Sequence, residues 1–274
     1  MQITSNLTVL CQELYFPEGP AFAADGTLWF VEQLKGSLSE YKQGILTRHD
    51  VGGRPNGIAI DKNGLIWFCD SIRNQIRRYD PRTARTTTIL SQVDNRPLNL
   101  PNDLAFDHAG NLLFTCSGEE LNKGDGYFCA WSPDGKLHKM DAICFYPNGL
   151  AFNANGRQLY IAETGTHRIW RGNWDSEAMS WDTPSIFTET GGPIGPDGMA
   201  FDEEGRLYVA VFGSSCIHVY DQEGKLAQQI ELSGTNPTNC AFDPYGTLGL
   251  VITETQKGQL LSHQTELRGI MSLS

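Results

Sequence analysis

Six polar residues recur at one position of a repeated pattern, and their types could do chemistry. Each follows a proline that lies nine residues before a glycine, from Pro17 and Gly26 in the first copy to Pro237 and Gly246 in the last. The six residues are Glu18, Asn56, Asn102, Asn148, Asp197 and Thr238. Two are carboxylates, three are amides and one is a hydroxyl, so every potential ligand atom among them is an oxygen, the donor that hard divalent cations prefer.

The two carboxylates support a cation site more strongly if they lie close together. Glu18 and Asp197 would then repel each other unless a cation sat between them or one of them was protonated. Histidine and cysteine are absent from all six positions. A zinc site of the usual nitrogen and sulfur type therefore fits less well than calcium, magnesium or manganese.

The same residues also have a simpler explanation. Pro-Asn-Gly and Pro-Asp-Gly are ordinary turn sequences, and Asn56, Asn148 and Asp197 could exist only to start a strand. Glu18 is explained poorly in this way, because glutamate has no comparable turn role. From the residues alone both interpretations stay open, since short motifs often match by chance.

The elements that must position these residues follow from the repeat itself. The six anchor glycines lie 38, 46, 46, 49 and 41 residues apart, which is the period of a four-stranded propeller blade. In the second copy, the ranges 57–60, 65–69, 75–79 and 86–90 have the alternating apolar residues of strands. We therefore predict an all-β, six-bladed β-propeller whose inner strands bring the six polar residues around one central channel.

The ring is expected to close through the N-terminus. The last copy supplies only three strands, ending with 248–252 and 258–262, and the range 7–10 can supply the fourth. Such closure removes the unpaired edges that an open array of repeats would expose. Residues 1–274 are predicted to form a single β-propeller domain without a linker.

Composition excludes several function classes. The net charge is −11 and no basic stripe is present, which argues against a nucleic-acid partner. The sequence contains no run of 18 apolar residues, so no membrane span is predicted. The N-terminus does not resemble a signal peptide. Seven cysteines without a Cys-x-x-Cys pair favour a reduced, cytoplasmic setting.

Two segments depart from the tight repeat. Residues 117–126 join the second and third strands of the third blade through a long polar loop that could overhang the channel mouth. Residues 172–183 predict an extended hairpin in the fourth blade. Insertions of this kind are common at functional rims, although most are only tolerated loops.

Four of the motifs, in register and at the right spacing, resemble those of the SMP-30/gluconolactonase/luciferin-regenerating-enzyme family. They are Phe16-Pro17-Glu18-Gly19-Pro20, Asn99-Leu100-Pro101-Asn102-Asp103, Tyr146-Pro147-Asn148-Gly149-Leu150 and Gly195-Pro196-Asp197-Gly198-Met199. The resemblance covers essentially the whole chain. It implies a six-bladed propeller with one divalent metal in its central channel and, in many members, hydrolysis of sugar lactones.

The family's residues carry over position by position. The resemblance implies Glu18, Asn148 and Asp197 as metal ligands, and Asn102 as a substrate or metal-shell residue. Leu100 stands where the animal lactonases have an arginine, so that sugar contact is absent and the identity of the substrate is in doubt. The bacterial gluconolactonase-like form Asn-x-Pro-Asn-Asp matches better and adds Asn99 as a substrate contact. Glu120, eighteen residues after Asn102, matches a family glutamate that contacts substrate.

The sequence thus predicts a metal-dependent hydrolase that opens a sugar lactone ring, with a small-molecule lactone as its partner and neither nucleic acid nor membrane. One divalent cation is implied, calcium first, with Mg²⁺, Mn²⁺ or Zn²⁺ as alternatives. Asp197 is the candidate general base because it can contact both metal and water. Asp103 is either catalytic or bonded to neighbouring backbone amides.

Two other functions stay open. The same metal could serve the hydrolysis of another ester or of a phosphotriester. A non-catalytic calcium-binding propeller is the third reading, because the fold hosts many binding modules.

Overall fold

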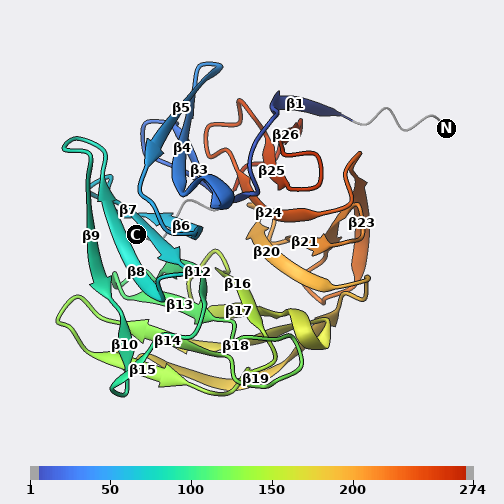
Figure 1. The fold of residues 1–274 in the computed structure, drawn as a ribbon. Coiled ribbons are helices and arrows are strands. Elements are labelled where there is room, and N and C mark those ends of the chain that lie inside the picture. Colours follow the sequence, from blue (N-terminus) through green and yellow to red (C-terminus); the bar gives the residue numbers. More distant parts are fainter. Residues whose placement is uncertain (1–5, 270–274) are drawn as a thin grey trace.

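The computed structural model describes residues 6–269, and it consists almost entirely of short antiparallel strands. Six four-stranded sheets are arranged as blades around a central axis (Figure 1). The predicted all-β, six-bladed propeller is confirmed. No helix within the described range is long and apolar enough to span a bilayer.

The first three blades follow the sequence order from the inner to the outer strand. Blade 1 contains β2 (Pro17–Phe22), β3 (Leu28–Glu32), β4 (Ser37–Lys42) and β5 (Ile45–Asp50). Blade 2 contains β6 (Pro55–Ile60), β7 (Ile66–Asp70), β8 (Gln75–Asp80) and β9 (Arg85–Leu90). Blade 3 contains β12 (Pro101–Phe106), β13 (Leu112–Cys116), β14 (Tyr127–Trp131) and β15 (Leu137–Met140).

The next two blades repeat this order. Blade 4 contains β16 (Pro147–Phe152), β17 (Gln158–Glu163), β18 (Arg168–Asp175) and β19 (Ser180–Glu189). Blade 5 contains β20 (Gly195–Phe201), β21 (Leu207–Phe212), β22 (Cys216–Tyr220) and β23 (Leu226–Glu231). The expected long hairpin of blade 4 is present as β18 and β19. The minor elements are β10 (Gln92–Val93), β11 (Arg96–Pro97) and the 3₁₀ turns η1 (Gln33–Lys35) and η2 (Thr164–Thr166).

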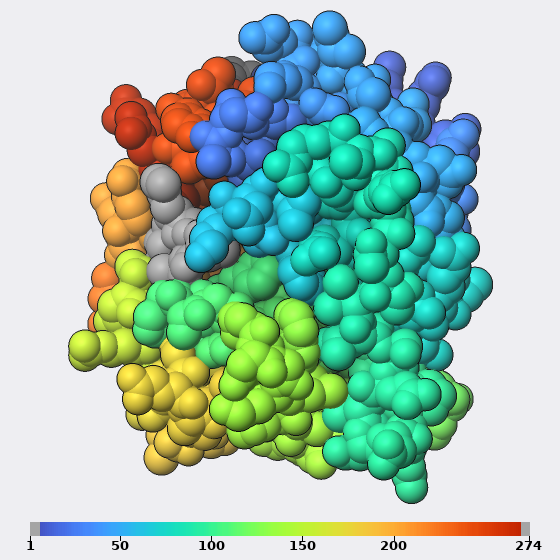
Figure 2. All heavy atoms as spheres, turned by 90° about the vertical axis from the view of Figure 1, so that its left-hand side faces the viewer, coloured from blue at the N-terminus to red at the C-terminus, as the bar shows by residue number. Residues whose placement is uncertain are grey.

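Blade 6 closes the ring. It contains β24 (Pro237–Phe242), β25 (Leu250–Glu254), β26 (Gln259–His263) and, as its outer strand, β1 (Leu7–Cys11). In the side view of Figure 2 orange to red C-terminal residues lie beside blue N-terminal residues. The expected closure by an N-terminal strand is therefore confirmed, with β1 paired antiparallel to β26.

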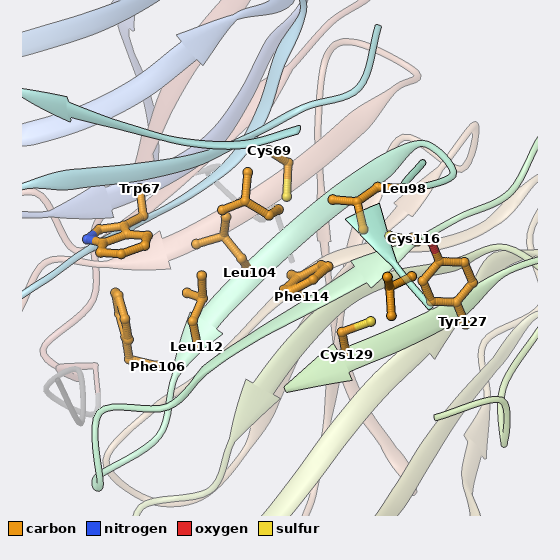
Figure 3. Packing of buried hydrophobic residues seen from close by; sticks show 12 residues of the cluster. Trp67, Cys69, Leu98, Leu104, Phe106, Leu112, Phe114, Cys116, Tyr127 and Cys129 are labelled. Atoms are coloured by element: carbon orange, nitrogen blue, oxygen red, sulfur yellow. The ribbon is translucent and has the colours of Figure 1, made fainter. Parts of the chain in front are cut away.

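The hydrophobic core lies between the faces of neighbouring blades. Figure 3 shows one such layer, where Trp67 of blade 2 packs against Phe106 of blade 3 with ring centroids 5.7 Å apart. Phe114 is fully buried in the same layer, and Cys69 and Cys116 lie beside it as small apolar side chains. All seven cysteines are free. Packing of this kind holds each blade in a fixed position relative to its neighbours and so fixes the channel.

The inner strands begin with a β-bulge in every blade. The register between first and second strands shifts just after the proline, for example between Pro101 and Leu104 and between Pro147 and Leu150. Bulges re-aim the side chains of a strand. The shift lies at or just after the polar residue of the repeat, and five of these six residues line the cavity in the channel.

Deleting residues 1–12 should unfold or aggregate the protein. The deletion removes β1 and exposes β26 as an unpaired edge, which is a template for association. We expect a lower melting temperature and loss of soluble protein, measured by thermal unfolding and size-exclusion chromatography. Deleting residues 1–5 leaves β1 whole and is the control. A soluble 1–12 deletion with an unchanged melting temperature would contradict the closure.

Candidate functional site in the central channel

A cavity of about 710 Å³ occupies one end of the channel, a size within the usual range for small-molecule sites. Five of the six repeated polar residues line it, namely Glu18, Asn56, Asn102, Asn148 and Asp197. Thr238 does not belong to this group. Its hydroxyl donates to the Pro17 carbonyl at 2.9 Å and lies 2.7 Å from the Thr253 hydroxyl, so it is fully buried in the wall.

Close packing of the inner strands brings these side chains together. At the position after the polar residue, four blades have glycine, and an added Cβ would collide with the next strand. A Cβ on Gly149 would lie 2.5 Å from the carbonyl oxygen of Asp197. Side chains larger than hydrogen would force the blades apart, so the glycines set the width of the channel.

Asp103 and Asn239 occupy the corresponding position in the two remaining blades, and their side chains fill the space that the glycines leave. The Asn239 amide donates to the Asp103 carboxylate across the channel at 3.5 Å. Asp103 Oδ1 also accepts a hydrogen bond from the Leu104 amide at 2.8 Å. Asp103 and Asn239 line a second cavity, of about 380 Å³, and are not among the described residues that line the first.

The amide side chains of Asn102 and Asn148 are oriented in the same way. Asn102 Nδ2 donates to the Ser117 hydroxyl at 2.9 Å, and Asn148 Nδ2 donates to the Thr164 hydroxyl at 3.1 Å. Each hydroxyl in turn donates to a carbonyl of the next blade, that of Pro147 or Pro196. Among the described residues no donor is assigned to either amide oxygen, so both are available to a ligand in the cavity.

Asn56 differs from these two asparagines. Its Oδ1 accepts a hydrogen bond from Gln33 Nε2 at 2.9 Å, and Gln33 Oε1 accepts one from Arg54 Nε at 3.0 Å. The oxygen that could bind a cation is therefore already used by the protein. This separates Asn56 from the candidate ligands on geometric grounds.

Burial shapes the electrostatics of the channel floor. Glu18 is 5% exposed and Asp197 is 9% exposed. Burial, followed by the charge of Asp103, raises the pKa of Glu18. Burial, followed by the charges of Glu18 and Asp103, raises the pKa of Asp197 well above its usual value. Burial also raises the pKa of Asp103 to about 7. Three carboxyl groups thus share one poorly solvated region, where negative charge is costly without a cation.

The donor set has two carboxylates and amide oxygens rather than a cluster of acids and imidazoles. Within residues 6–269, no three His, Cys, Asp or Glu side chains gather in the geometry of a metal site. The asparagine oxygens in the channel add ligand atoms of a different kind to the two carboxylates. The residues present fit a hard cation with oxygen ligands, and they do not fit a nitrogen and sulfur zinc site.

The loop between β13 and β14 overhangs this cavity, as its length suggested. Glu119, Glu120 and Leu121 of the loop line the wall. Asn99 is placed differently. Its amide lies 3.4 Å from Asp125 at the base of the loop, and it is not among the described residues that line the cavity. Its contact with substrate stays a prediction.

Sequence reasoning missed three residues of this region. Asn239 had a readable signal, because it replaces the glycine of the repeat as Asp103 does. Gln33 and Arg54 line the cavity but lie outside the repeated polar position, and nothing in the repeat identifies them.

Fold and cavity together define a six-bladed propeller with a buried acidic floor in its channel. The profile of the SMP-30/gluconolactonase/LRE-like region matches residues 16–256, and the chain belongs to this family.

Three similar proteins share between 23% and 28% of their residues with this chain. A diisopropyl-fluorophosphatase of Loligo vulgaris is 26% identical, over 96% of this chain and 93% of its own. A gluconolactonase of Zymomonas mobilis is 28% identical, over 90% of this chain and 78% of its own. The crystal structure of a calcium-binding protein, regucalcin, from Agrobacterium tumefaciens superimposes with a TM-score of 0.84 at 23% identity, covering 96% of this chain and 95% of that one. This structural likeness shows the fold.

In the presence of a chelator, stability should fall as pH rises from 4 to 7. A carboxyl whose folded pKa lies above its unfolded value of about 4 binds protons more tightly when folded. Its contribution to the free energy of unfolding is complete below pH 4. This contribution is lost as the pH rises through the pKa of the folded state, which is about 7 for Asp103. Urea unfolding across this range checks the slope.

Asp103→Asn is the matched variant, because it keeps the side-chain shape and removes one titrating group. Histidines such as His218, whose pKa burial lowers, act equally in both proteins and cancel in the comparison. We expect a shallower loss of stability in the variant. Identical slopes for parent and variant would show that Asp103 does not titrate in this way.

Proposed function

We propose that the protein is a metal-dependent hydrolase that opens a lactone ring, as a gluconolactonase does. The observation that carries the proposal is the pair of buried carboxylates, Glu18 and Asp197, facing the same cavity as the free amide oxygens of Asn102 and Asn148. The Zymomonas gluconolactonase relative supports the reaction class.

The proposed ligands are Glu18, Asn148 and Asp197. Two carboxylates and an amide oxygen suit calcium best, and Mg²⁺, Mn²⁺ or Zn²⁺ are the alternatives. The structurally similar Agrobacterium regucalcin is a calcium-binding protein, which supports the choice of calcium. Asn102 has the same tethered amide as Asn148, so its oxygen lies available beside this set for substrate or cation.

A bound cation would supply Lewis-acid polarisation of the lactone carbonyl and stabilise charge on its oxygen. Asp197 would accept the proton of the attacking water, because a carboxylate beside the reacting carbonyl can act as general base. Thr164 orients Asn148 because its hydroxyl oxygen accepts a 3.1 Å hydrogen bond from Asn148 Nδ2. Glu120, Asn102 and Asn99 would hold substrate hydroxyls at the loop side of the cavity.

A second candidate is the hydrolysis of a phosphotriester on the same site. The Loligo diisopropyl-fluorophosphatase relative, aligned over almost the whole chain, favours it. A panel of lactones and organophosphates, assayed with one protein preparation, separates the two. The non-catalytic calcium-binding propeller predicts cation binding without turnover of either class. The position of the polar residues inside the channel cavity argues against a non-catalytic propeller.

The setting of the protein is part of this proposal. Seven free cysteines support a reduced, cytoplasmic compartment. The net charge of −11 supports a small-molecule partner in preference to nucleic acid. We also propose that residues 1–274 form one domain, which the six contiguous blades support.

Glu18→Ala and Asp197→Ala should both weaken cation binding, because each deletes a charged oxygen ligand. At saturating cation they should differ. Glu18→Ala should recover part of its turnover, whereas Asp197→Ala should stay about 10²–10⁴-fold low through loss of the base. Calorimetric titration with Ca²⁺ and lactone assays measure the two effects.

Asn56→Ala is the control for this pair, because the oxygen of Asn56 is already bonded to Gln33. It should bind the cation nearly normally. If Glu18→Ala and Asp197→Ala also bound it like the parent, the repeated polar residues would be turn chemistry and the hydrolase proposal would lose its basis.

Glu120→Gln should change substrate use without changing cation affinity, because Glu120 lies on the loop and is exposed. We expect a higher KM for a hydroxylated lactone and an unchanged calcium Kd. A collapse of calcium affinity with constant turnover per bound cation would show that Glu120 belongs to the cation site.

A further inference from the structure

The residue before the proline of the repeat has an unusual backbone in three blades. Phe16, Leu100 and Tyr146 have φ values of 57°, 52° and 61°, in the left-handed region. Their side chains all line the cavity. Bulky residues rarely adopt this conformation, and a following proline disfavours helical conformations further.

The fold holds these three residues in place by one repeated hydrogen bond. The carbonyl of Phe16 accepts from the Gln33 amide at 3.0 Å, that of Leu100 from the Ser117 amide at 3.0 Å, and that of Tyr146 from the Thr164 amide at 3.1 Å. The donors follow the second strand of the same blade. Backbone strain that the surroundings maintain is typical of functional positions.

Three more apolar side chains line the same cavity from its rim. Leu121 of the overhanging loop is 36% exposed and Ile194 before β20 is 38% exposed, while Phe212 ends β21. The apolar collar is defined here as Phe16, Leu100, Leu121, Tyr146, Ile194 and Phe212. It draws on four blades.

Two of the polar side chains beside the collar are already bonded within the protein. Gln33 is bonded to both Asn56 and Arg54, and the Glu119 carboxylate pairs with Lys123. The alkyl side chains of Leu100, Leu121 and Ile194 offer a hydroxyl no hydrogen-bond partner, and burying a hydroxyl without a partner is unfavourable. An apolar group would instead remove both its own surface and that of the collar from water.

We propose that the apolar collar binds an alkyl or aryl substituent of the substrate, so that the preferred substrates are hydrophobic lactones or esters rather than polyhydroxylated sugar lactones. This inference rests on the proposed hydrolase function and specifies its substrate class. The ester group lies at the polar floor, between Glu18, Asn148 and Asp197, and the substituent points to the channel mouth. Leu100 is the specificity residue at the centre of the proposal.

The test is a series of γ-lactones, from unsubstituted γ-butyrolactone to a pentyl-substituted ring, with D-glucono-δ-lactone for comparison. All are assayed with the full chain and saturating Ca²⁺. We expect kcat/KM to rise by about threefold to fourfold for each added methylene, the value for burial of one such group. We also expect the pentyl lactone to exceed gluconolactone.

Leu100→Asn removes the apolar side chain at similar size, and asparagine tolerates a positive φ, so the variant should fold. Ile194→Asn tests the rim at an exposed position. Both should reduce the rise per methylene, with at least a tenfold loss on the pentyl lactone for Leu100→Asn. Ile45→Asn, on β5 and 68% exposed outside the cavity, is the matched control and should keep the parent slope.

A parent that hydrolyses lactones with no dependence on chain length, or that prefers gluconolactone, would overturn the collar and leave the hydrolase proposal standing. The collar would also be overturned, and the hydrolase proposal left standing, if Leu100→Asn kept the parent's rise in kcat/KM per methylene. If the protein hydrolysed none of the lactones, both the hydrolase proposal and this inference would be overturned.

Discussion

The close approach of the inner strands is the constraint on which the rest of the structure depends. At the position after the polar residue, the glycines of two blades lie directly against backbone of the next inner strand. A Cβ on Gly19 would lie 2.9 Å from Gly57 Cα, and one on Gly149 would lie 2.5 Å from the Asp197 carbonyl. This packing narrows the channel and gathers side chains from blades that are far apart in sequence. Asp103 and Asn239 are joined across the channel by a hydrogen bond.

The same constraint creates an electrostatic problem. Burying Glu18 and Asp197 near Asp103 removes water from groups that carry like charges, and it raises the pKa of each. Removing one partner of a buried charge arrangement, or failing to supply it, is generally destabilising. The proposed cation, bound between Glu18 and Asp197, would relieve this repulsion and would be a partner for both carboxylates. The hydrogen bonds that hold Asn102 and Asn148 leave amide oxygens ready to complete such a site.

Much of the fold could be predicted from the sequence, because each blade of a propeller repeats the same residue pattern at a similar spacing. The spacing from Pro17 to Gly26 recurs in all six blades, and the strand at Leu7 was required to complete the last sheet. The convergence of Glu18, Asn148 and Asp197 followed from their equivalent positions in the blades.

Other features were beyond the reach of residue patterns. The position of Thr238 fits the repeat, yet its hydroxyl bonds to Pro17 of the neighbouring blade and leaves the cavity. Asn56 matches Asn148 in sequence but differs in its partner, Gln33, whose position depends on η1. The left-handed backbone of Leu100 has no sequence signal, because a leucine before proline ordinarily predicts an extended conformation.

The central claim is that the channel floor holds one divalent cation. Anomalous diffraction from crystals grown with Mn²⁺, a cation that accepts the same oxygen ligands, tests it most directly. The account predicts one strong peak within about 2.0–2.6 Å of carboxylate oxygens of Glu18 and Asp197 and of the Asn148 amide oxygen. A channel without a peak in crystals that bind manganese elsewhere would contradict it.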